Sequence, residues 1–316
     1  MFTHTCLVVL LTCIIIIGVL FNMSVFVNFE TLEGQDHMIV EQRHCPVCPT
    51  GPIVVDTDTI PEKTTKAQSL YSFSVATPTK RRPQCDYVHV IASAMWMNTS
   101  PDMIGTVVKH WTIINADRDF EEHSALAVVK NLFELPLKTW WSIIPTPDRG
   151  DLSPFDKPDR YGTPAHQRQW RNNESMDYIA CVNSAIEACP NCTHIIILED
   201  DFLMSGNWVE TLLEDIETHG VQPVTALWYY AKGFEHTGTV ATMWEKEFVV
   251  KFLPYLRQHM GDFPVDWAIG RFLQSLHLDY HYLSSSLGQH IGIKSSLETR
   301  KFTPVTRDFG PNGRTF

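Results

Sequence analysis

One short run constrains the fold of this 316-residue chain more than any other feature. Residues 194–198 (HIIIL) are apolar after the first position, and Glu199, Asp200 and Asp201 follow them directly. Such a run predicts a strand buried on both faces, which occurs mostly in parallel sheets. Ligands of open α/β sheets bind at the carboxyl ends of the strands. The three carboxylates are therefore expected at a binding edge.

Three neighbouring carboxylates at the end of a strand favour a divalent cation. Mg²⁺ and Mn²⁺ prefer oxygen ligands, and they commonly bind through one or two carboxylates together with substrate phosphates. We therefore expect Mn²⁺ or Mg²⁺ at this edge, beside a nucleotide-linked substrate. The alternative is that Glu199, Asp200 and Asp201 only cap a following helix, because acidic side chains favour helix N-termini.

Strand-like and helix-like segments alternate along the chain. Short β-branched or aromatic runs predict strands over 86–92, 111–115, 138–144 and 194–198. The spacing of apolar residues predicts a helix over 166–188. This alternation indicates an α/β fold with a mainly parallel central sheet that is covered on both faces.

The N-terminal part of the sequence predicts a membrane anchor. Residues 7–27 are mostly apolar and long enough to cross a bilayer, so we expect a transmembrane signal anchor after a cytosolic tail of residues 1–6. A cleaved signal peptide is the alternative, although no clear small-x-small cleavage site follows. Residues 28–84 are rich in Thr, Pro and polar side chains and are interpreted as a stem, before a lumenal domain over 85–316.

Sequons and cysteines agree with a lumenal domain. Three Asn-x-Ser/Thr sequons begin at Asn98, Asn173 and Asn191. Six of the eight cysteines follow the apolar segment, and an even number is consistent with disulfides in an oxidising compartment. A zinc site built from the C-x-x-C pairs at 45–48 and 189–192 is the alternative, but these pairs lie much farther apart than in ribbon or finger motifs.

The charge of the chain argues against nucleic acid as a partner. The formal net charge is −11, and no basic stripe with interleaved aromatic residues is present in the sequence. We therefore expect no nucleic-acid surface.

Two candidate donor-binding residues lie at or after predicted strands. Asp117 follows the predicted strand 111–115 and so reaches a carboxyl edge, where it could contact a nucleoside. The alternative is that Asp117 caps a helix over 120–133. His89 lies within the predicted strand 86–92 and is a further candidate for donor binding.

Asp266 opens a predicted helix within the sequence DFPVDW at 262–267. A carboxylate at the mouth of the site could act as a general base, taking a proton from an acceptor hydroxyl as it attacks a sugar. The alternative is that Asp266 only caps the helix.

The segment 288–297 (GQHIGIKSSL) offers polar groups suited to a diphosphate. His290 could be an imidazole ligand, and Lys294 and Ser295 could donate hydrogen bonds to donor phosphates. A single histidine is more often structural. Its occurrence together with the acidic run is what favours a metal-binding role for His290.

Three motifs, in this order, resemble a family of glycosyltransferases. ILEDD at 197–201, FPVDW at 263–267 and QHIGIKSSL at 289–297 are similar to the catalytic domain of the N-acetylglucosaminyltransferase IV family, which extends N-glycan antennae. They also resemble the related GPI-glycan N-acetylgalactosamine transferase family. The resemblance covers roughly residues 178–297.

This resemblance implies a GT-A-type, Rossmann-like domain, a nucleotide-sugar donor, a divalent cation and an inverting transfer. By position, Asp201 would be the principal metal ligand, and Glu199 and Asp200 would contact metal-bound water or the donor ribose. Asp266 would be the general base, and His290 would lie near the metal and the diphosphate.

The motifs leave three functions open. The first is transfer of N-acetylglucosamine from UDP-GlcNAc to a glycoprotein glycan, by a single-pass type II enzyme of the Golgi or ER membrane. The second is transfer of N-acetylgalactosamine to a GPI or glycolipid core. The GPI-directed family that the motifs resemble carries a transmembrane hairpin within its catalytic domain. In this chain, no second long apolar stretch follows Phe21. The third is an inactive lumenal protein that binds glycans or nucleotide sugars. A homo-oligomer is compatible with all three.

Overall fold

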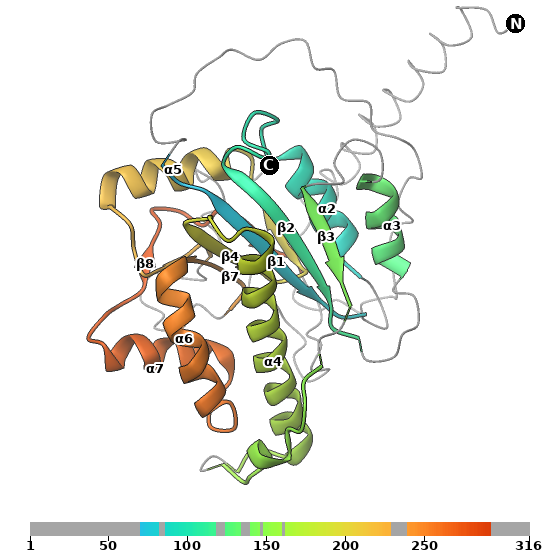
Figure 1. Ribbon diagram of the computed structural model, residues 1–316, viewed down its shortest axis with the longest axis vertical. Helices are drawn as coiled ribbons and strands as arrows, with labels where there is room; N and C mark the ends of the chain where they lie inside the picture. Colours follow the sequence, from blue (N-terminus) through green and yellow to red (C-terminus); the bar gives the residue numbers. More distant parts are fainter. Residues whose placement is uncertain are drawn as a thin grey trace, which may run out of the picture. The chain divides into compact units, whose positions relative to one another are not determined.

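The fold is an α/β arrangement built around one mixed sheet (Figure 1). The computed structural model describes residues 70–81, 86–117, 124–133, 140–145, 148–159, 162–228 and 239–291. In this part of the chain the sheet has seven strands in the order β3-β2-β1-β4-β7-β6-β8. Strands β3, β2, β1 and β4 are parallel to one another. The predicted class is confirmed, and the order is compatible with a Rossmann-like fold.

The described elements comprise a main sheet, a small ladder and two layers of helices. The main sheet contains β1 (Phe73–Thr79), β2 (Val108–Asn115), β3 (Trp141–Ile144), β4 (His194–Leu198), β6 (Val224–Ala226), β7 (Ala241–Glu245) and β8 (His281–Tyr282). The ladder pairs β5 (Phe202–Met204) with β9 (Gly288–His290). The helices are α2 (Val88–Met97), α3 (Ser124–Phe133), α4 (Ala165–Ala188), α5 (Trp208–His219), α6 (Lys246–His259) and α7 (Val265–Ser275), and η2 (Ser153–Phe155) is a short 3-10 helix.

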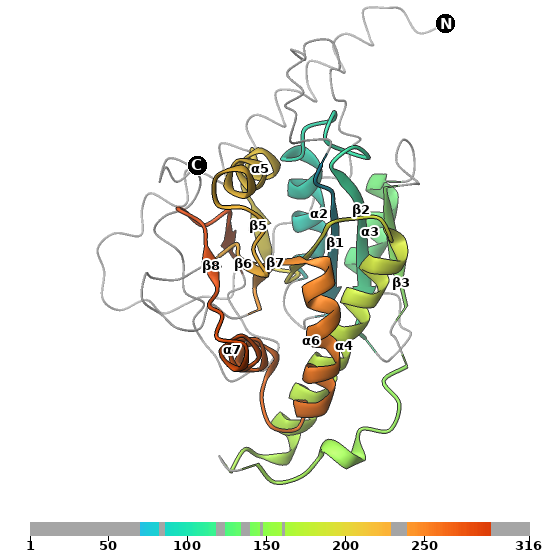
Figure 2. The ribbon, with the colours of Figure 1, turned by 60° about the vertical axis from the view of Figure 1, so that its left-hand side comes forward.

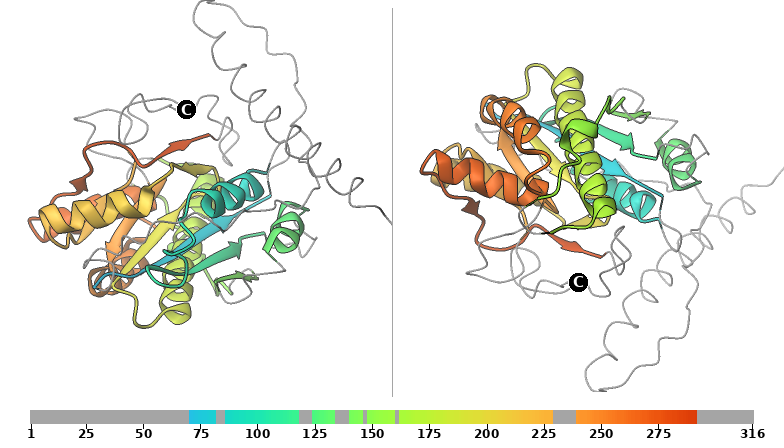
Figure 3. Two further views of the ribbon diagram at one scale, coloured as in Figure 1. Left: turned by 90° about the horizontal axis from the view of Figure 1, so that it is seen from above. Right: turned by 90° about the horizontal axis from the view of Figure 1, so that it is seen from below.

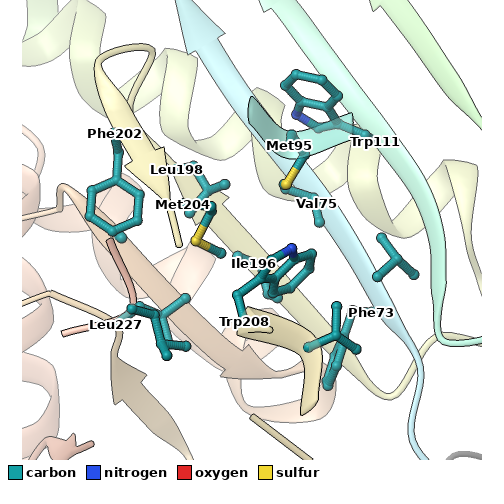
Figure 4. Packing of buried hydrophobic residues seen from close by; sticks show 14 of the residues in the cluster. Phe73, Val75, Met95, Trp111, Ile196, Leu198, Phe202, Met204, Trp208 and Leu227 are labelled. Atoms are coloured by element: carbon teal, nitrogen blue, oxygen red, sulfur yellow. The ribbon is translucent and has the colours of Figure 1, made fainter. Parts of the chain in front are cut away.

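Strand β4 lies inside the sheet, between β1 and β7, and all five of its residues are buried. Its side chains alternate between two cores. Ile196 and Leu198 pack in one core with residues of α2, α3 and α5, and Figure 4 shows Ile196 near Trp208 and Leu198 near Met204. Ile195 and Ile197 pack in the other core with residues of α4, α6 and α7. Burying each such side chain contributes about 1.5–3 kcal/mol, which explains why the strand is apolar on both faces.

The two layers of helices cover opposite faces of the sheet. Figure 3 shows the sheet between them, with α2 and α5 on one side and α4 and α6 on the other. Helices α4 and α6 lie side by side, and α7 packs against both (Figure 2). This arrangement leaves the carboxyl ends of the parallel strands at one edge of the sheet, where the acidic run leaves β4.

Three of the four predicted strands and the long predicted helix are confirmed. The strands expected over 111–115, 138–144 and 194–198 overlap β2, β3 and β4, and the helix over 166–188 matches α4.

The strand predicted over 86–92 is wrong, because this segment begins helix α2. The helix buries Val88, Ile91, Ala92 and Met95, which recur at the three- and four-residue spacing of one helical face. A short apolar run fits a strand and a helix about equally well. Here the buried residues follow the three- and four-residue spacing of a helix.

The central strand β1 comes from a part of the chain that we interpreted as stem. Strand β1 pairs in parallel with β2 on one side and with β4 on the other, and Phe73 and Val75 are fully buried. The folded domain therefore includes residues before the predicted boundary at position 85. Because this stretch is rich in Thr and Pro, its sequence indicated a linker and not a buried strand.

Cys189 and Cys192 form a disulfide directly after α4. The alternative zinc site that would have used this pair is therefore wrong, because a disulfide leaves no thiolate to bind metal. Cys181 is a buried free thiol in the part of the chain that the structure describes.

The predicted anchor over residues 7–27 lies outside the described residues. Among the residues that are described, no helix has the length and apolar character needed to span a membrane.

Candidate functional site

The acidic run leaves the sheet at the carboxyl end of β4. Strand β4 ends at Leu198, and strand β5 begins at Phe202, so the three carboxylates occupy the connection between two strands. The next helix, α5, begins only at Trp208. The alternative that Glu199, Asp200 and Asp201 cap a following helix is therefore wrong.

The β5–β9 ladder brings His290 to this edge from a distant part of the sequence. Phe202 is paired with His290, and the backbone N–H of Ile291 donates to the carbonyl oxygen of Asp201 over 2.8 Å. As a result, Nε2 of His290 lies 2.9 Å from Oδ1 of Asp201 and 3.5 Å from Oε2 of Glu199. The structure thus joins three residues that the sequence proposed as metal ligands.

The surroundings of this group hold its side chains in place. The side chains of Asp201 and His290 are only 4% and 14% exposed, whereas that of Glu199 is 34% exposed. Oγ1 of Thr239 donates to Oε1 of Glu199 over 3.1 Å. The indole of Trp228 lies with its ring centre 5.9 Å from that of His290. The group is therefore enclosed on most sides and open beside Glu199.

The two carboxylates change the proton affinity of His290. Burial alone would lower the pKa of His290, but hydrogen bonding and charge attraction from Asp201 and Glu199 outweigh it and raise this pKa to about 10. In the absence of a metal, an imidazolium ion therefore offsets part of the negative charge of the two carboxylates at neutral pH.

The donor atoms of Glu199, Asp201 and His290 suit a metal ion. The three atoms lie within 4.8 Å of one another. Two carboxylates and one imidazole form a ligand set that divalent cations such as Mn²⁺ accept, and a bound cation would replace the imidazolium proton as the counter-charge. The residues present therefore fit a divalent cation.

Asp200 points to a different partner from its two neighbours. Its Oδ2 accepts a 2.9 Å hydrogen bond from Oγ1 of Thr79 and a longer one of 3.4 Å from the backbone N–H of Lys80. Thr79 is the last residue of β1, and Lys80 directly follows it. Asp200 is 6% exposed, and these hydrogen bonds tie β1 to the acidic run.

Asp117 lies at the same carboxyl edge, after β2. Its Oδ2 accepts a 2.8 Å hydrogen bond from the backbone N–H of Arg81, and Ala116 donates to the carbonyl of Thr79 over 2.7 Å. These bonds join the carboxyl ends of β1 and β2 beside the carboxyl end of β4. The start of the helix that Asp117 was expected to cap lies outside the described residues.

Asp266 is the second residue of α7, whose N-cap position is occupied by Pro264. The alternative that Asp266 is the cap is therefore wrong. Its Oδ1 instead accepts a 2.9 Å hydrogen bond from the backbone N–H of Trp267. The carboxylate sits at the start of the helix, where the helix dipole favours a negative charge.

Glu174 is a functional candidate that the sequence reasoning missed. Burial raises its pKa well above the usual value, and the negative charges of Asp266, Glu199 and Asp177 raise it further. Its Oε2 is enclosed and has no hydrogen-bond partner among the described residues. Glu174 therefore lies within electrostatic reach of both the expected base and the metal-binding group.

The position of Glu174 on helix α4 could have identified this residue from the sequence. Arg171 lies three residues before it and Tyr178 four residues after it, and both are buried. A carboxyl on the buried face of a long helix is uncommon, because burying its charge is costly, so such a residue is a candidate for a functional role.

Of the other three expected donor-binding residues, the structure describes His89 alone. His89 lies in the first turns of α2 instead of on a strand. Lys294 and Ser295 lie outside the described residues.

Comparison with known proteins does not assign the chain to a family. No family model matches the chain, and no curated protein matches its sequence. The candidate site therefore rests on the sequence and on the geometry of the described residues.

Proposed function

We propose that this chain is a metal-dependent inverting glycosyltransferase that moves N-acetylglucosamine from UDP-GlcNAc to a glycoprotein glycan. The observation that carries the proposal is the grouping of Glu199, Asp201 and His290 at the carboxyl edge of a mainly parallel sheet. This edge is where α/β folds bind nucleotides, and divalent cations commonly link such nucleotides to carboxylates. The resemblance of the three motifs to the N-acetylglucosaminyltransferase IV family supplies the reaction class and the sugar.

Glu199, Asp201 and His290 would hold Mn²⁺ or Mg²⁺ in this proposal. Such a cation, when bound, neutralises the negative charge that builds on a departing nucleoside diphosphate. Asp200 keeps the acidic run fixed to β1 through Thr79. Asp117, which follows the end of β2, would contact the nucleoside of the donor in this proposal.

Asp266 would act as the general base. The acceptor hydroxyl attacks the anomeric carbon from the side opposite to UDP, a new C–O bond forms, and the bond to the UDP oxygen breaks with inversion. The hydroxyl proton passes to the carboxylate of Asp266. The charge interaction that Asp266 and Glu199 share with Glu174 supports placing the base near the metal-binding residues.

The proposed setting is the lumen of the Golgi or ER, with the chain anchored by residues 7–27. The disulfide between Cys189 and Cys192 supports an oxidising compartment, and the sequon residue Asn191 is exposed on the turn that this disulfide closes.

A donor screen tests the proposal directly. The full-length chain, purified in detergent, is incubated with UDP-GlcNAc, UDP-GalNAc and GDP-sugars, with Mn²⁺ or with a chelator, and free nucleotide is measured. We expect Mn²⁺-dependent release of UDP from UDP-GlcNAc. Release from UDP-GalNAc instead would favour the alternative GPI or glycolipid acceptor.

Variants separate the proposed roles. Asp201→Ala and Asp266→Asn are each expected to lower transfer by about 10²-fold or more, because one removes a metal ligand and the other the base. Asp262→Asn is a matched control, since Asp262 is exposed, lies four residues before Asp266 and pairs with His259. Full activity of Asp266→Asn would contradict the assigned base. A wild-type chain with no turnover, which still binds UDP-sugar, would favour an inactive binding protein.

A further inference from the structure

A second group of side chains that could hold a metal ion shares no residue with the candidate site. It consists of Asp215 and His219 in α5 and His281 in strand β8, and its three donor atoms lie within 4.8 Å of one another. Nδ1 of His219 is 3.0 Å from Oδ1 of Asp215. Nε2 of His281 is 2.9 Å from Oδ2 and 3.1 Å from Oδ1 of the same carboxylate.

This ligand set differs in kind from the one at the sheet edge. Two imidazoles and one carboxylate match the ligands of zinc sites with three protein ligands, in which a water molecule completes a tetrahedron. With bonds of about 2.0–2.1 Å, adjacent ligand atoms of a tetrahedral zinc ion are about 3.3 Å apart. The nitrogen–oxygen distances around Asp215 are close to this value, so a zinc ion requires only small movements of the side chains.

The location also favours a cation. Asp215 and His219 are one turn apart at the C-terminal end of α5, where the partial negative charge of the helix dipole attracts positive ions. The side chain of Asp215 is 8% exposed and that of His281 is 17% exposed. The side chain of His219 is 52% exposed, so the group opens to solvent on one side.

We propose that Asp215, His219 and His281 form a zinc site that fastens the edge strand β8 to helix α5. Among the described residues, strand β8 pairs at two positions, Thr225↔His281 and Ala226↔Tyr282, and so gains little from these hydrogen bonds. Zinc would bind the deprotonated ring nitrogens that now face Asp215. This site has its own ligands and does not depend on the proposed transferase function.

Zinc binding by variants provides the test. The full-length chain is stripped with chelator, and Zn²⁺ binding is measured by calorimetry and by elemental analysis after dialysis. The background is His290→Ala, which removes a ligand of the first group. We expect one zinc ion per chain in this background, and none after adding His219→Ala or His281→Ala.

The matched control is His259→Ala in the same background. His259 and Asp262 form a pair with the same 3.0 Å separation, but they belong to neither group of three found among the described residues. This control is expected to keep its zinc ion. Because His219 is half exposed, His219→Ala removes a ligand with little risk to folding.

Thermal unfolding gives a second measurement. At zinc concentrations about 100-fold above the dissociation constant, the His290→Ala background should gain about 5–10 °C in melting temperature. Adding His219→Ala should abolish this gain, while His259→Ala should retain it. Absence of zinc binding in the His290→Ala background, or equal binding after loss of His219 and His281, overturns the proposal. Neither result depends on transferase activity.

Discussion

Adjacent residues of the acidic run have different partners. Asp201 and Glu199 face His290, whereas Asp200 accepts hydrogen bonds from the end of β1. The sequence identifies all three as carboxylates at a strand end, but it does not distinguish ligand from support. That distinction depends on which side each residue presents after the chain leaves the sheet.

Proton and metal are expected to compete for His290. Because the pKa of the metal-free histidine is about 10, a divalent cation must displace a proton at neutral pH. The affinity of the chain for Mn²⁺ should therefore rise about tenfold for each pH unit between pH 6.5 and 8.5. Calorimetry at several pH values measures this slope. His290→Gln should bind more weakly and lose the slope, and a pH-independent wild type would contradict the assignment.

Glu174 should make the folded state less stable as pH rises. Its pKa is raised in the folded state, so the stability present below the unfolded pKa is lost as pH climbs through the folded pKa. Glu174→Gln removes this titration, and we expect its free energy of unfolding to vary less between pH 4.5 and 8 than that of wild type. Glu187→Gln, an exposed position on the same helix, is the control and should follow wild type. Denaturant unfolding at each pH measures the difference.

The β5–β9 ladder is the element that assembles the site. It places β9 beside the residues that follow Asp201, although 88 positions separate Phe202 from its partner His290. Gly288 allows the close approach. A Cβ atom at this position would collide with the ring of Phe202 and lie 2.5 Å from the carbonyl oxygen of Leu203.

Gly288→Ala is therefore expected to disturb the ladder. Overpacking of this kind costs about 1–3 kcal/mol, and the displaced strand should weaken Mn²⁺ binding through His290. Gly206→Ala is the matched control, because a Cβ atom at Gly206 meets nothing within 4 Å. Thermal unfolding and Mn²⁺ titration of both variants provide the comparison. Equal behaviour of the two variants would show that the ladder tolerates the added methyl group.

Elements with a strong pattern were predictable, and ambiguous ones were not. The run 194–198 is apolar throughout its last four positions, so its place as a buried strand followed from the sequence. The segment 86–92 fits both patterns, and only the buried positions of α2 identify the helix. The partners of β5 and β9 could not be predicted, because short strands carry no signal of the distant residues they pair with.

At the scale of the whole molecule, β1 connects the parts of the sheet that meet at the site. It lies between β2 and β4, and its last residue, Thr79, bonds to Asp200. A chain that begins at Gln84 lacks this strand and should show no cooperative thermal transition by circular dichroism. A chain that begins at Lys66 retains β1 and should unfold cooperatively. Cooperative unfolding of the shorter chain would show that β1 is dispensable.

The sequence by itself determined the α/β class, the strand that delivers the carboxylates and the types of residue able to bind a metal. These features follow from local spacing and from the chemistry of single side chains. Only the tertiary structure decided that His290 meets Asp201 and Glu199, that Glu174 lies within electrostatic reach of Asp266, and that His281 joins Asp215 and His219. The physical reason is that strand pairing and helix packing bring together residues far apart in the chain, and local patterns do not encode those distances.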